Sequence, residues 1–389
     1  MKNLQDFLAQ KPLYYKKIDL TRMPKAYESV KDILVIPKII HIVGTNGKGS
    51  TGRFLAHMLH KKGFKTGHYT SPHIVRFNER IWLEGKDVSD ETLENAHIQL
   101  QKTFPKKVVE SLSYFEYTTF LAMKVFEDCD YVVLEAGLGG EYDATNVFRK
   151  VLSLFTPIAY DHQAFLGEDI ESIAKTKLRS MDKRAIIGYQ KYKKIYDIAE
   201  DIAKQKGTEL KKIDDFLTES EKKEIEEFIK ETGFAPFFAQ NCQLAAAAFK
   251  ALGEDFEKEL LKDVKIRGRM EKIAPNITID VGHNPLAAEA IKTAVKKNSI
   301  LVYNSFEDKD CKKVLSILKP VIKRVEILEI PNERAVDKEL LVSVLNELDI
   351  DFCLFDKIDE KENYLVFGSF SVVEEFLRIY EKKIYNNNQ

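Results

Sequence analysis

The sequence predicts an α/β protein with two domains, each built on a mostly parallel sheet with helices packed against it. Three observations support this fold class. A Gly-rich turn, GTNGKGST at residues 44–51, joins an apolar β-like run to a helix-like stretch. Apolar strand-like runs alternate with helical patterns through most of the 389 residues, which favours a parallel, helix-flanked sheet. A second alternating series begins after the segment 262–270. We therefore predict an N-terminal P-loop domain over residues 1–265 and a smaller, C-terminal Rossmann-like domain over residues 266–389.

The turn at 44–51 has the layout of a phosphate-binding loop. Its three glycines let the backbone approach a polyphosphate, and the following helix N-terminus directs N–H groups and the positive end of its dipole at it. Lys48 adds a cation, and the hydroxyls of Ser50 and Thr51 can reach phosphate or Mg²⁺. The spacing departs from the commonest P-loop, because a glycine follows the lysine. In its strand–turn–helix context the segment indicates nucleotide binding rather than a plain left-handed turn.

Further strands and helices follow from the same alternation. The second series has no GxGxxG, so we do not expect it to bind a dinucleotide by itself. The charge-rich residues 191–230 are expected to form a solvated helical region. The remaining expected strands are 131–134, 151–155, 185–187, 277–280, 300–303, 325–330 and 365–367, and the expected helices lie at 245–248, from 285, near 314–318, near 340–348 and from 372.

Two strand ends carry candidate metal ligands. Glu135 follows the run 131–134 and precedes three glycines, at the position where P-loop enzymes place a carboxylate that organises Mg²⁺. The alternative is a surface carboxylate at a strand end. Asp161 and His162 follow the next strand, but Mg²⁺ prefers oxygen ligands. A structural role for His162 therefore stays open on the residues alone.

Other polar segments lie where ligands commonly bind. The segment 70–80, TSPHIVRFNER, is rich in functional groups, although a plain loop is the alternative. RGR at 267–269 lies at the expected domain junction, and DVGHNP at 280–285 forms the first strand–helix turn of the second domain. Ligands favour domain clefts, and a cation from one domain over phosphates held by the other would couple closure to catalysis.

Composition narrows the function classes. Sixty Lys and Arg against 61 Asp and Glu leave no basic excess for nucleic acid. The four cysteines are far apart and form no CxxC pair, which disfavours zinc and disulfide frameworks and fits a reducing compartment. The N-terminus lacks a long apolar stretch, and no apolar run of about 18 residues occurs. We expect a soluble cytoplasmic protein, without a membrane or nucleic-acid partner, acting as a monomer.

Taken together, these motifs resemble the folylpolyglutamate synthase/dihydrofolate synthase family within the Mur ligase superfamily. The P-loop and HNP elements are shared with cell-wall ligases, whereas TSPH with FNERI and GLGG with DATN single out the folate branch. In family order, the motifs are GTNGKGS at 44–50, TSPH at 70–73, FNERI at 77–81, YFEYT at 114–118, EAGLGG at 135–140, DATN at 143–146, DH at 161–162 with LG at 166–167, RGRME at 267–271, DVGHNP at 280–285, DKD at 308–310, RA at 334–335 and GS at 368–369.

The resemblance implies ATP and two Mg²⁺ ions as cofactors and a pterin substrate. For the nucleotide it implies Thr45, Asn46, Gly47, Lys48, Gly49, Ser50, Thr51, Asn241, Arg267 and Asp280. For the pterin substrate it implies Lys17, Ile18, Asp19, Leu20, Ser113, Tyr114, Phe115, Glu116, Tyr142, Asp143 and Ala144. For the metals it implies Ser71, Glu135, His162 and Lys177, and for catalysis Lys48, Lys177, Arg267 and His283.

Lys177 is the position that the resemblance identifies as a carbamylated lysine. An ammonium beside two Mg²⁺ ions would be repelled, whereas a carbamate reverses the charge and supplies the oxygen ligands that Mg²⁺ prefers. The alternative is a free surface lysine. The family usually reads EKAGI here and has Arg after GLGG, so Thr176, residues 178–180 and Glu141 depart from its pattern.

The activity implied is ATP-driven addition of L-glutamate to dihydropteroate, reduced folates or both, through an acyl phosphate. One alternative is another Mur-type ligase acting on a cell-wall precursor. A nucleotide-binding switch is disfavoured because no Asn-Lys-x-Asp guanine-binding motif occurs. A non-catalytic ATP-binding protein is disfavoured because Lys48, Glu135, His162 and Arg267 are all present.

Overall fold

The computed structural model describes residues 2–12 and 19–387, and side chains as far as residue 382. By contacts the chain divides into two compact units. The first contains Met1–Ile225 and Ala239–Val264, and the second contains Glu226–Phe238 and Lys265–Gln389. The sequence prediction groups residues 226–238 with the N-terminal domain, whereas the contacts group them with the second unit. Assignment of separate functions to residues 1–265 and 266–389 remains a prediction.

The first unit contains, within the described residues, an eight-stranded sheet of order β4-β3-β2-β5-β1-β6-β7-β8. Its strands β2, β5, β1, β6, β7 and β8 pair in parallel, and β3 is antiparallel to both of its neighbours. The predicted α/β class is confirmed. The strands are β1 Lys38–Val43, β2 Thr66–Tyr69, β3 Ile81–Leu83, β4 Lys86–Asp87, β5 Tyr131–Glu135, β6 Lys150–Phe155, β7 Arg184–Ile187 and β8 Glu209–Lys212.

One prediction about this sheet is wrong. Residues 191–230 are not helical throughout, because β8 extends the sheet by pairing in parallel with β7. Its sequence, ELKK, is polar because an edge strand has one neighbour and its side chains remain largely solvated. Polar composition alone therefore does not reveal the pairing.

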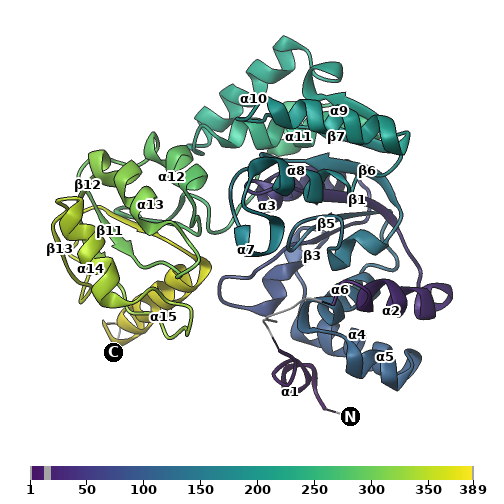
Figure 1. Cartoon of the computed structure of the whole chain (residues 1–389), viewed down its shortest axis with the longest axis horizontal. Helices are drawn as coiled ribbons and strands as arrows, with labels where there is room; N and C mark the ends of the chain where they lie inside the picture. Colours follow the sequence, from purple (N-terminus) through teal and green to yellow (C-terminus); the bar gives the residue numbers. More distant parts are fainter. Residues whose placement is uncertain (1, 13–18, 388–389) are drawn as a thin grey trace. The chain divides into compact units, whose positions relative to one another are not determined.

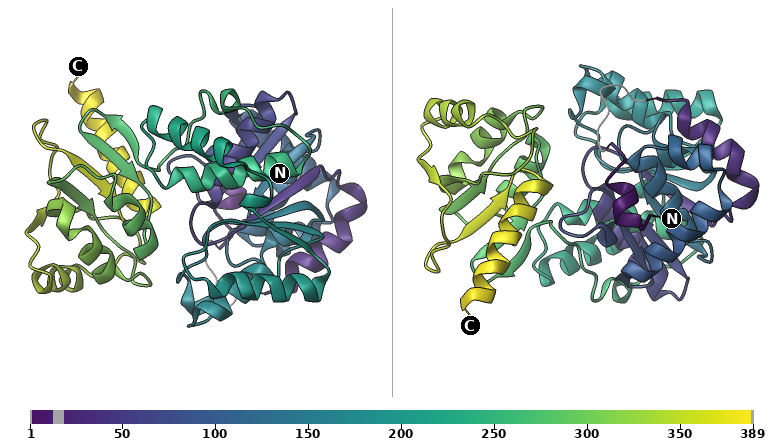
Figure 2. Two further views of the ribbon diagram at one scale, coloured as in Figure 1. Left: turned by 90° about the horizontal axis from the view of Figure 1, so that it is seen from above. Right: turned by 90° about the horizontal axis from the view of Figure 1, so that it is seen from below.

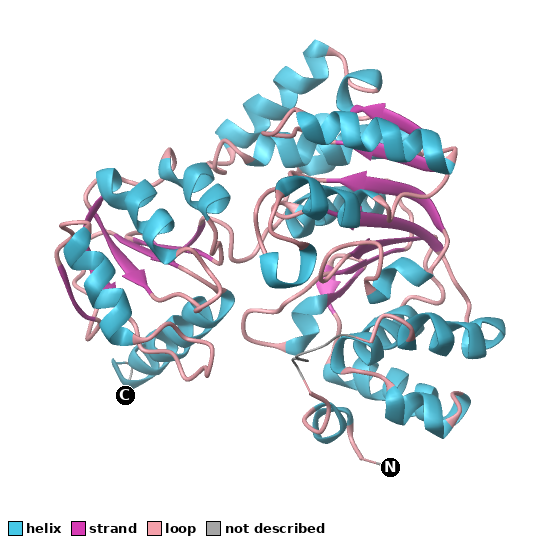
Figure 3. Ribbon diagram, viewed as in Figure 1, coloured by secondary structure: helices cyan, strands magenta, loops and turns pink. Residues whose placement is uncertain are grey.

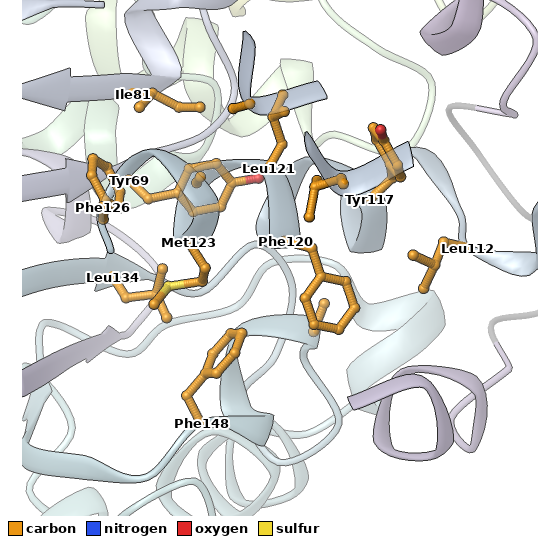
Figure 4. Packing of buried hydrophobic residues seen from close by; sticks show 14 of the residues in the cluster. Tyr69, Ile81, Leu112, Tyr117, Phe120, Leu121, Met123, Phe126, Leu134 and Phe148 are labelled. Carbon is orange, nitrogen blue, oxygen red and sulfur yellow. The ribbon is translucent and has the colours of Figure 1, made fainter. Parts of the chain in front are cut away.

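Helices cover both faces of the first sheet (Figures 1 and 2). On one face α3 approaches β2 so closely that a Cβ on Gly52 would lie 2.4 Å from His68 Nε2. On the other face Phe120 and Met123 of α6 join Leu134 of β5 in one buried cluster (Figure 4). The helices of this unit are α1 Leu4–Leu8, α2 Arg22–Val30, α3 Lys48–Lys61, α4 Asp90–Thr103, α5 Lys106–Ser111, α6 Tyr114–Val125, α7 Gln163–Leu166, α8 Ile170–Leu178, α9 Lys194–Lys206 and most of α11 Phe238–Ala251, while α10 Glu219–Glu231 is divided between the units.

The second unit repeats the layered arrangement on a smaller scale (Figure 3). In the described part of the chain its sheet has the order β13-β12-β11-β14-β10-β9, with only the β9–β10 pair antiparallel. The predicted strands and helices of this series are confirmed, with ends shifted by a few residues. Its elements are β9 Glu271–Ala274, β10 Ile277–Asp280, α12 Pro285–Lys292, β11 Ser299–Tyr303, α13 Cys311–Leu318, β12 Ile322–Ile327, α14 Lys338–Glu347, β13 Phe352–Leu354, β14 Tyr364–Phe367 and α15 Phe370–Asn387.

Candidate nucleotide and metal site

The phosphate-binding turn is fixed to the neighbouring strand end. β1 leads directly into it, and α3 begins at its end with Gly47 as the N-cap at φ 85°, a left-handed conformation that favours glycine. A Cβ on Gly44 would lie 1.9 Å from Thr156 Oγ1, so the loop lies directly against the end of β6. The backbone N–H groups of Thr45 and Asn46 both donate to one carbonyl after β6, at 2.9 and 3.3 Å. The turn is therefore held in place by backbone contacts.

Asn241 supports the turn from α11. A Cβ on Gly47 would lie 2.5 Å from its Oδ1, and Asn241 is buried. The fold thus brings Asn241 to the loop, although the two are far apart in the sequence. The sequence-predicted nucleotide residues of the first unit all meet at this corner.

Glu135 and Lys48 face each other across the turn. Lys48 Nζ lies 3.9 Å from Glu135 Oε1 and donates to the carbonyls of Gly44 and Thr45 at 3.2 and 3.1 Å. The side chain of Glu135 is nearly buried, and the residue is 5% exposed. Its Oε2 accepts from the Thr70 hydroxyl and, at 3.3 Å, from the Ser71 N–H. A carboxylate, a cation and a hydroxyl therefore converge at one point.

Two buried hydroxyls in the first turn of α3 complete this corner. Ser50 and Thr51 are both buried. Among the described residues Thr51 Oγ1 has no hydrogen-bond partner, which is uncommon for a buried polar atom. A cradle of glycines, a carboxylate and an unpaired hydroxyl fits a phosphate and a hard divalent cation, since Mg²⁺ takes oxygen ligands.

Lys177 lies in the same corner. Helix α8 returns the residue to the P-loop, where its Nζ donates to Gly44 O at 2.9 Å. It is 4% exposed, so the alternative of a surface lysine is wrong. Burial, and then the nearby Lys48 charge, lower the pKa of Lys177 to about 7, against the opposing effect of Asp161 and Asp143.

His162 is the N-cap residue of the short helix α7, beyond the end of β6. It has φ 52°, a left-handed conformation that is uncommon for a non-glycine residue and is concentrated at functional sites. Its Nε2 lies 3.9 Å from Asp161 Oδ2. The preceding loop is tied to the P-loop, because Ala159 N and O both contact Thr45 Oγ1, at 3.0 and 3.1 Å. These contacts anchor the loop that leads to His162 against the P-loop.

The turn after β5 holds Asp143 in a rigid setting. Its carboxylate accepts from Leu138 N at 2.7 Å, and from Thr145 N and Oγ1 at 2.9 and 2.5 Å. Burial raises the pKa of Asp143, and these hydrogen bonds oppose that rise. Tyr142 beside it is 54% exposed, whereas Ala144 is buried. The predicted pterin-binding turn is therefore a fixed loop that exposes one ring.

The second predicted pterin segment caps α6. Ser113 and Glu116 form a reciprocal capping box, and Glu116 Oε2 also pairs with Arg22 Nε at 2.6 Å. The Phe115 ring lies under the loop after β5, where a Cβ on Gly137 would be 2.6 Å from it. Tyr114 is partly buried.

The predicted pterin residues 17–20 are described only in part. Asp19 accepts a hydrogen bond from Thr21 N at 2.9 Å, and Leu20 is exposed. Lys17 and Ile18 lie outside the described residues.

The remaining predicted residues belong to the second unit. Asp280 ends β10 and is buried, with Oδ1 accepting from Gly282 N at 2.7 Å and Oδ2 from Met270 N at 3.0 Å. Burial raises the pKa of Asp280, and Arg269 is the first of several opposing influences. His283 Nδ1 lies 3.3 Å from Val281 O. A role for Arg267, Asp280 and His283 beside a nucleotide bound by the first unit stays a prediction.

Comparison with known proteins decides the family. Residues 42–249, which include the P-loop, Glu135 and Lys177, match the model of the Mur ligase middle domain. A Haemophilus influenzae protein named dihydrofolate synthase/folylpolyglutamate synthase is 31% identical, covering 95% of each chain. The chain belongs to the folylpolyglutamate synthase/dihydrofolate synthase family.

Solved structures of this family have the same fold. A folylpolyglutamate synthetase from Helicobacter pylori is 43% identical with a TM-score of 0.79, covering 97% of this chain and 98% of that one. An E. coli FolC structure in complex with DHPP and ADP is 25% identical with a TM-score of 0.80, covering 98% of each chain.

Two positions at which this family member departs from the usual motif contact each other. Arg179 Nη1 lies 3.5 Å from Glu141 Oε2, and Glu141 N donates to Thr176 O at 2.8 Å. An acidic residue after GLGG is therefore matched by a basic residue after Lys177. These contacts join the Asp143 turn to the end of α8.

Sequence reasoning gave Thr70 no role beyond its place in the polar segment 70–80, and it missed Thr156 and His41 as residues that shape the site. Thr70 binds Glu135, and Thr156 supports Gly44. The strand β2, which Thr70 directly follows, was not predicted because its sequence TGHY has no apolar alternation. His41, in the middle of β1, contacts Thr145 beside Asp143. The only signal in the sequence was a polar residue within an apolar strand.

Proposed function

We propose that this chain is an ATP-dependent ligase that adds L-glutamate to dihydropteroate, reduced folates or both. Family membership gives the reaction class. The observation that carries the proposal is the convergence of Lys48, Glu135 and Lys177 on the turn at Gly44, at the carboxyl edge of the first sheet. A structure of the E. coli relative holds ADP together with DHPP, which supports a site for both a nucleotide and a second ligand.

In the proposed reaction the substrate carboxylate attacks the γ-phosphate of ATP, and ADP leaves as an acyl phosphate forms. The amino group of L-glutamate then attacks the acyl carbon, the amide bond forms and phosphate departs. Both the carboxylate and the triphosphate are negatively charged, so the protein must hold two repelling anions in contact. Lys48 offsets part of that charge, and the N–H groups at the start of α3 orient the phosphates.

Ser71, Glu135 and His162 are proposed to hold Mg²⁺ together with a modified Lys177. A bound Mg²⁺ ion supplies positive charge that stabilises the developing charge on the transferred phosphoryl group. Glu135 is preorganised for this role, since Thr70 and Ser71 already fix one of its oxygens.

Lys177 is proposed to carry a carbamate. Its lowered pKa leaves a large neutral fraction of the amine near pH 7, and only the neutral amine attacks CO₂. A nitrogen–carbon bond forms, one proton is released and the side chain becomes an anion. That anion would relieve the repulsion between Lys177 and Lys48.

The proposal also covers three residues of the second unit, the cellular location of the protein and its oligomeric state. Arg267, Asp280 and His283 are proposed to complete the site when the enzyme is loaded. Cytoplasmic location is supported by four free cysteines. In the portion of the chain that the structure describes, no helix combines the length and apolar character needed to cross a membrane. We propose a monomer, with small molecules as partners.

A cell-wall Mur-type ligase is the weaker candidate. The Haemophilus influenzae relative, matched over 95% of each chain, is named dihydrofolate synthase/folylpolyglutamate synthase. The turn that carries Asp143 is also present in this chain, with its carboxylate bonded to Leu138 N. The two functions predict different substrates, so a substrate comparison separates them.

The test is ADP release by the wild-type protein with ATP, Mg²⁺ and L-glutamate, comparing dihydropteroate with tetrahydrofolate. We expect ADP release that requires both L-glutamate and at least one folate substrate, with a glutamylated product visible by mass spectrometry. Lys48→Ala serves as the inactive control. ATP binding without glutamylation of either compound would overturn the proposal.

A further inference from the structure

A buried polar chain joins the strand of the P-loop to the turn that carries Asp143. His41 is in the middle of β1 and is 0% exposed. Its Nε2 lies 2.8 Å from Thr145 Oγ1, which in turn donates to Asp143 Oδ1 at 2.5 Å. Thr145 and Asp143 are also buried. Three buried polar side chains thus form a connected path from β1 to the turn.

The direction of these hydrogen bonds follows from counting protons. The Thr145 hydroxyl has one proton, and it donates that proton to Asp143, so it must accept from His41. Nε2 of His41 therefore carries a proton. Burial first, and then the Lys150 charge, lower the pKa of His41 well below its ordinary value. Among the described residues, neutral His41 donates its one side-chain hydrogen bond to Thr145.

Packing alone does not explain an imidazole at this position. Among the described residues His41 Nδ1 has no hydrogen-bond partner, and burying an unpaired polar atom costs stability. Ile39 and Val43 on the same face of β1 belong to apolar clusters, so an aliphatic side chain would suit the site. The imidazole is therefore best explained by the bond that it makes to Thr145.

The neighbouring strand holds the same turn in a second place. Lys150 of β6 donates from Nζ to Asn146 Oδ1 at 2.6 Å, and Asn146 Nδ2 donates to Glu141 O at 2.8 Å. β1 and β6 pair directly in the sheet. Two adjacent strands thus fix the turn, and one of them, β1, continues into the P-loop three residues after His41.

We propose that His41 is a positioning residue for the folate substrate, acting through Thr145 on the Asp143 turn. Because β1 also ends in the P-loop, the same strand sets the position of the nucleotide loop and of the substrate turn. Because His41 is fully buried, its proposed action on the substrate is indirect. This inference rests on the proposed function, since it assigns the Asp143 turn to the pterin compound.

The test compares His41→Leu, which fills the space without a donor, with His41→Gln, whose amide nitrogen can take the place of Nε2. We expect His41→Leu to raise KM for dihydropteroate by roughly tenfold, because small displacements of positioning groups have large kinetic effects. KM for ATP should stay unchanged, and His41→Gln should recover most of the loss. Thr145→Val should raise KM at least as much as His41→Leu, because it also removes the bond to Asp143, and the double variant should be no worse than Thr145→Val alone.

His57→Gln is the matched control. His57 is also buried and makes one hydrogen bond of 2.8 Å, but its partner is Lys262 O, near the end of the first unit's chain. We expect its KM for dihydropteroate to equal that of the wild type. Equal KM values for His41→Leu and the wild type, or a loss that His41→Gln does not recover, would overturn the proposal.

Hydrogen–deuterium exchange separates this inference from the proposed function. In His41→Leu, amides in residues 137–147 should exchange faster than in the wild type or His57→Gln, whatever the enzyme's activity. Faster exchange with an inactive wild type would overturn the proposed function and, with it, the assignment of a substrate to this turn. Unchanged exchange in that segment would overturn the role of His41 directly.

Discussion

Glu135 and Asp280 each end a strand, one in each unit, but their carboxylates have different surroundings. The contacts of Glu135 include two side chains, Lys48 with Nζ at 3.9 Å and Thr70 through its hydroxyl, besides the backbone N–H of Ser71 at 3.3 Å. Asp280 accepts from two backbone N–H groups of its own unit, at 2.7 and 3.0 Å. Side chains can regroup around a ligand, whereas backbone donors fix a turn. A carboxylate at a strand end can therefore present charge or organise its own loop, and its donors distinguish the two.

The largest expected effect is loss of activity on changing the charges around Glu135. Lys48→Ala removes a cation beside the proposed phosphates, and Glu135→Ala removes an anionic metal ligand. Loss of such preorganised charge costs on the order of 3–4 kcal/mol, or roughly a few hundredfold in kcat. Folding should survive, and thermal unfolding checks this. A variant with near-wild-type turnover would remove that residue from the site.

Lys177→Ala should abolish most activity while keeping the fold. The reason is loss of the proposed carbamate, and a small carboxylate such as acetate should partly restore turnover by occupying its place. Carbon NMR of protein equilibrated with labelled CO₂ should show one adduct that Lys177→Ala lacks. A high-resolution map with both metals bound and an unmodified Lys177 would contradict this prediction.

The pH dependence of stability should also reveal Lys177. Its pKa is about 7 in the folded protein and near 10.5 in an unfolded chain. Between these values the unfolded state binds more protons, so the free energy of unfolding should rise with pH. Below about 7 both states are protonated and the destabilisation is fully present. Denaturant titrations in CO₂-free buffer should show this rise, and Lys177→Met should flatten it.

Asp280→Asn should act mainly on the stability of the second unit. Replacing one carboxylate oxygen with an NH₂ group leaves a buried backbone N–H without an acceptor, at a cost of about 1–3 kcal/mol. Glu135→Gln should cost less, because one side-chain acceptor remains for Thr70. Urea unfolding measures both, with Glu360→Gln, an exposed carboxylate of the second unit, as the control. A larger loss for Glu135→Gln would reverse the comparison.

Local sequence signals predicted the parts of the fold that depend on neighbouring residues. The strand before Gly44, the turn and the helix after it were all readable because glycines, a lysine and apolar runs adjoin there. β2 and β8 were not predicted, since TGHY and ELKK lack strand patterns and form only by pairing with distant segments. Long-range pairing, rather than propensity, decides such strands.

The residues of the candidate site show the same contrast between local sequence signals and long-range contacts. Glu135 was predicted from its place after an apolar run, whereas Lys177 was assigned only through resemblance to a family. His41 escaped notice because its partner Thr145 is 104 residues away, and only the folded sheet brings them together. Side-chain contacts of this range leave no spacing pattern in a single sequence.

The central claim is that the site around Lys48 and Glu135 activates the substrate carboxylate as an acyl phosphate. The most direct test is to follow an oxygen atom from that carboxylate into the released phosphate. Dihydropteroate carrying heavy oxygen in its carboxylate is incubated with the wild-type enzyme, ATP, Mg²⁺ and L-glutamate, and the inorganic phosphate is analysed by mass spectrometry. The account predicts one labelled oxygen in each phosphate released, with the other label retained in the amide. Amide formation with unlabelled phosphate would contradict the acyl phosphate, and with it the role assigned to Lys48 and Glu135.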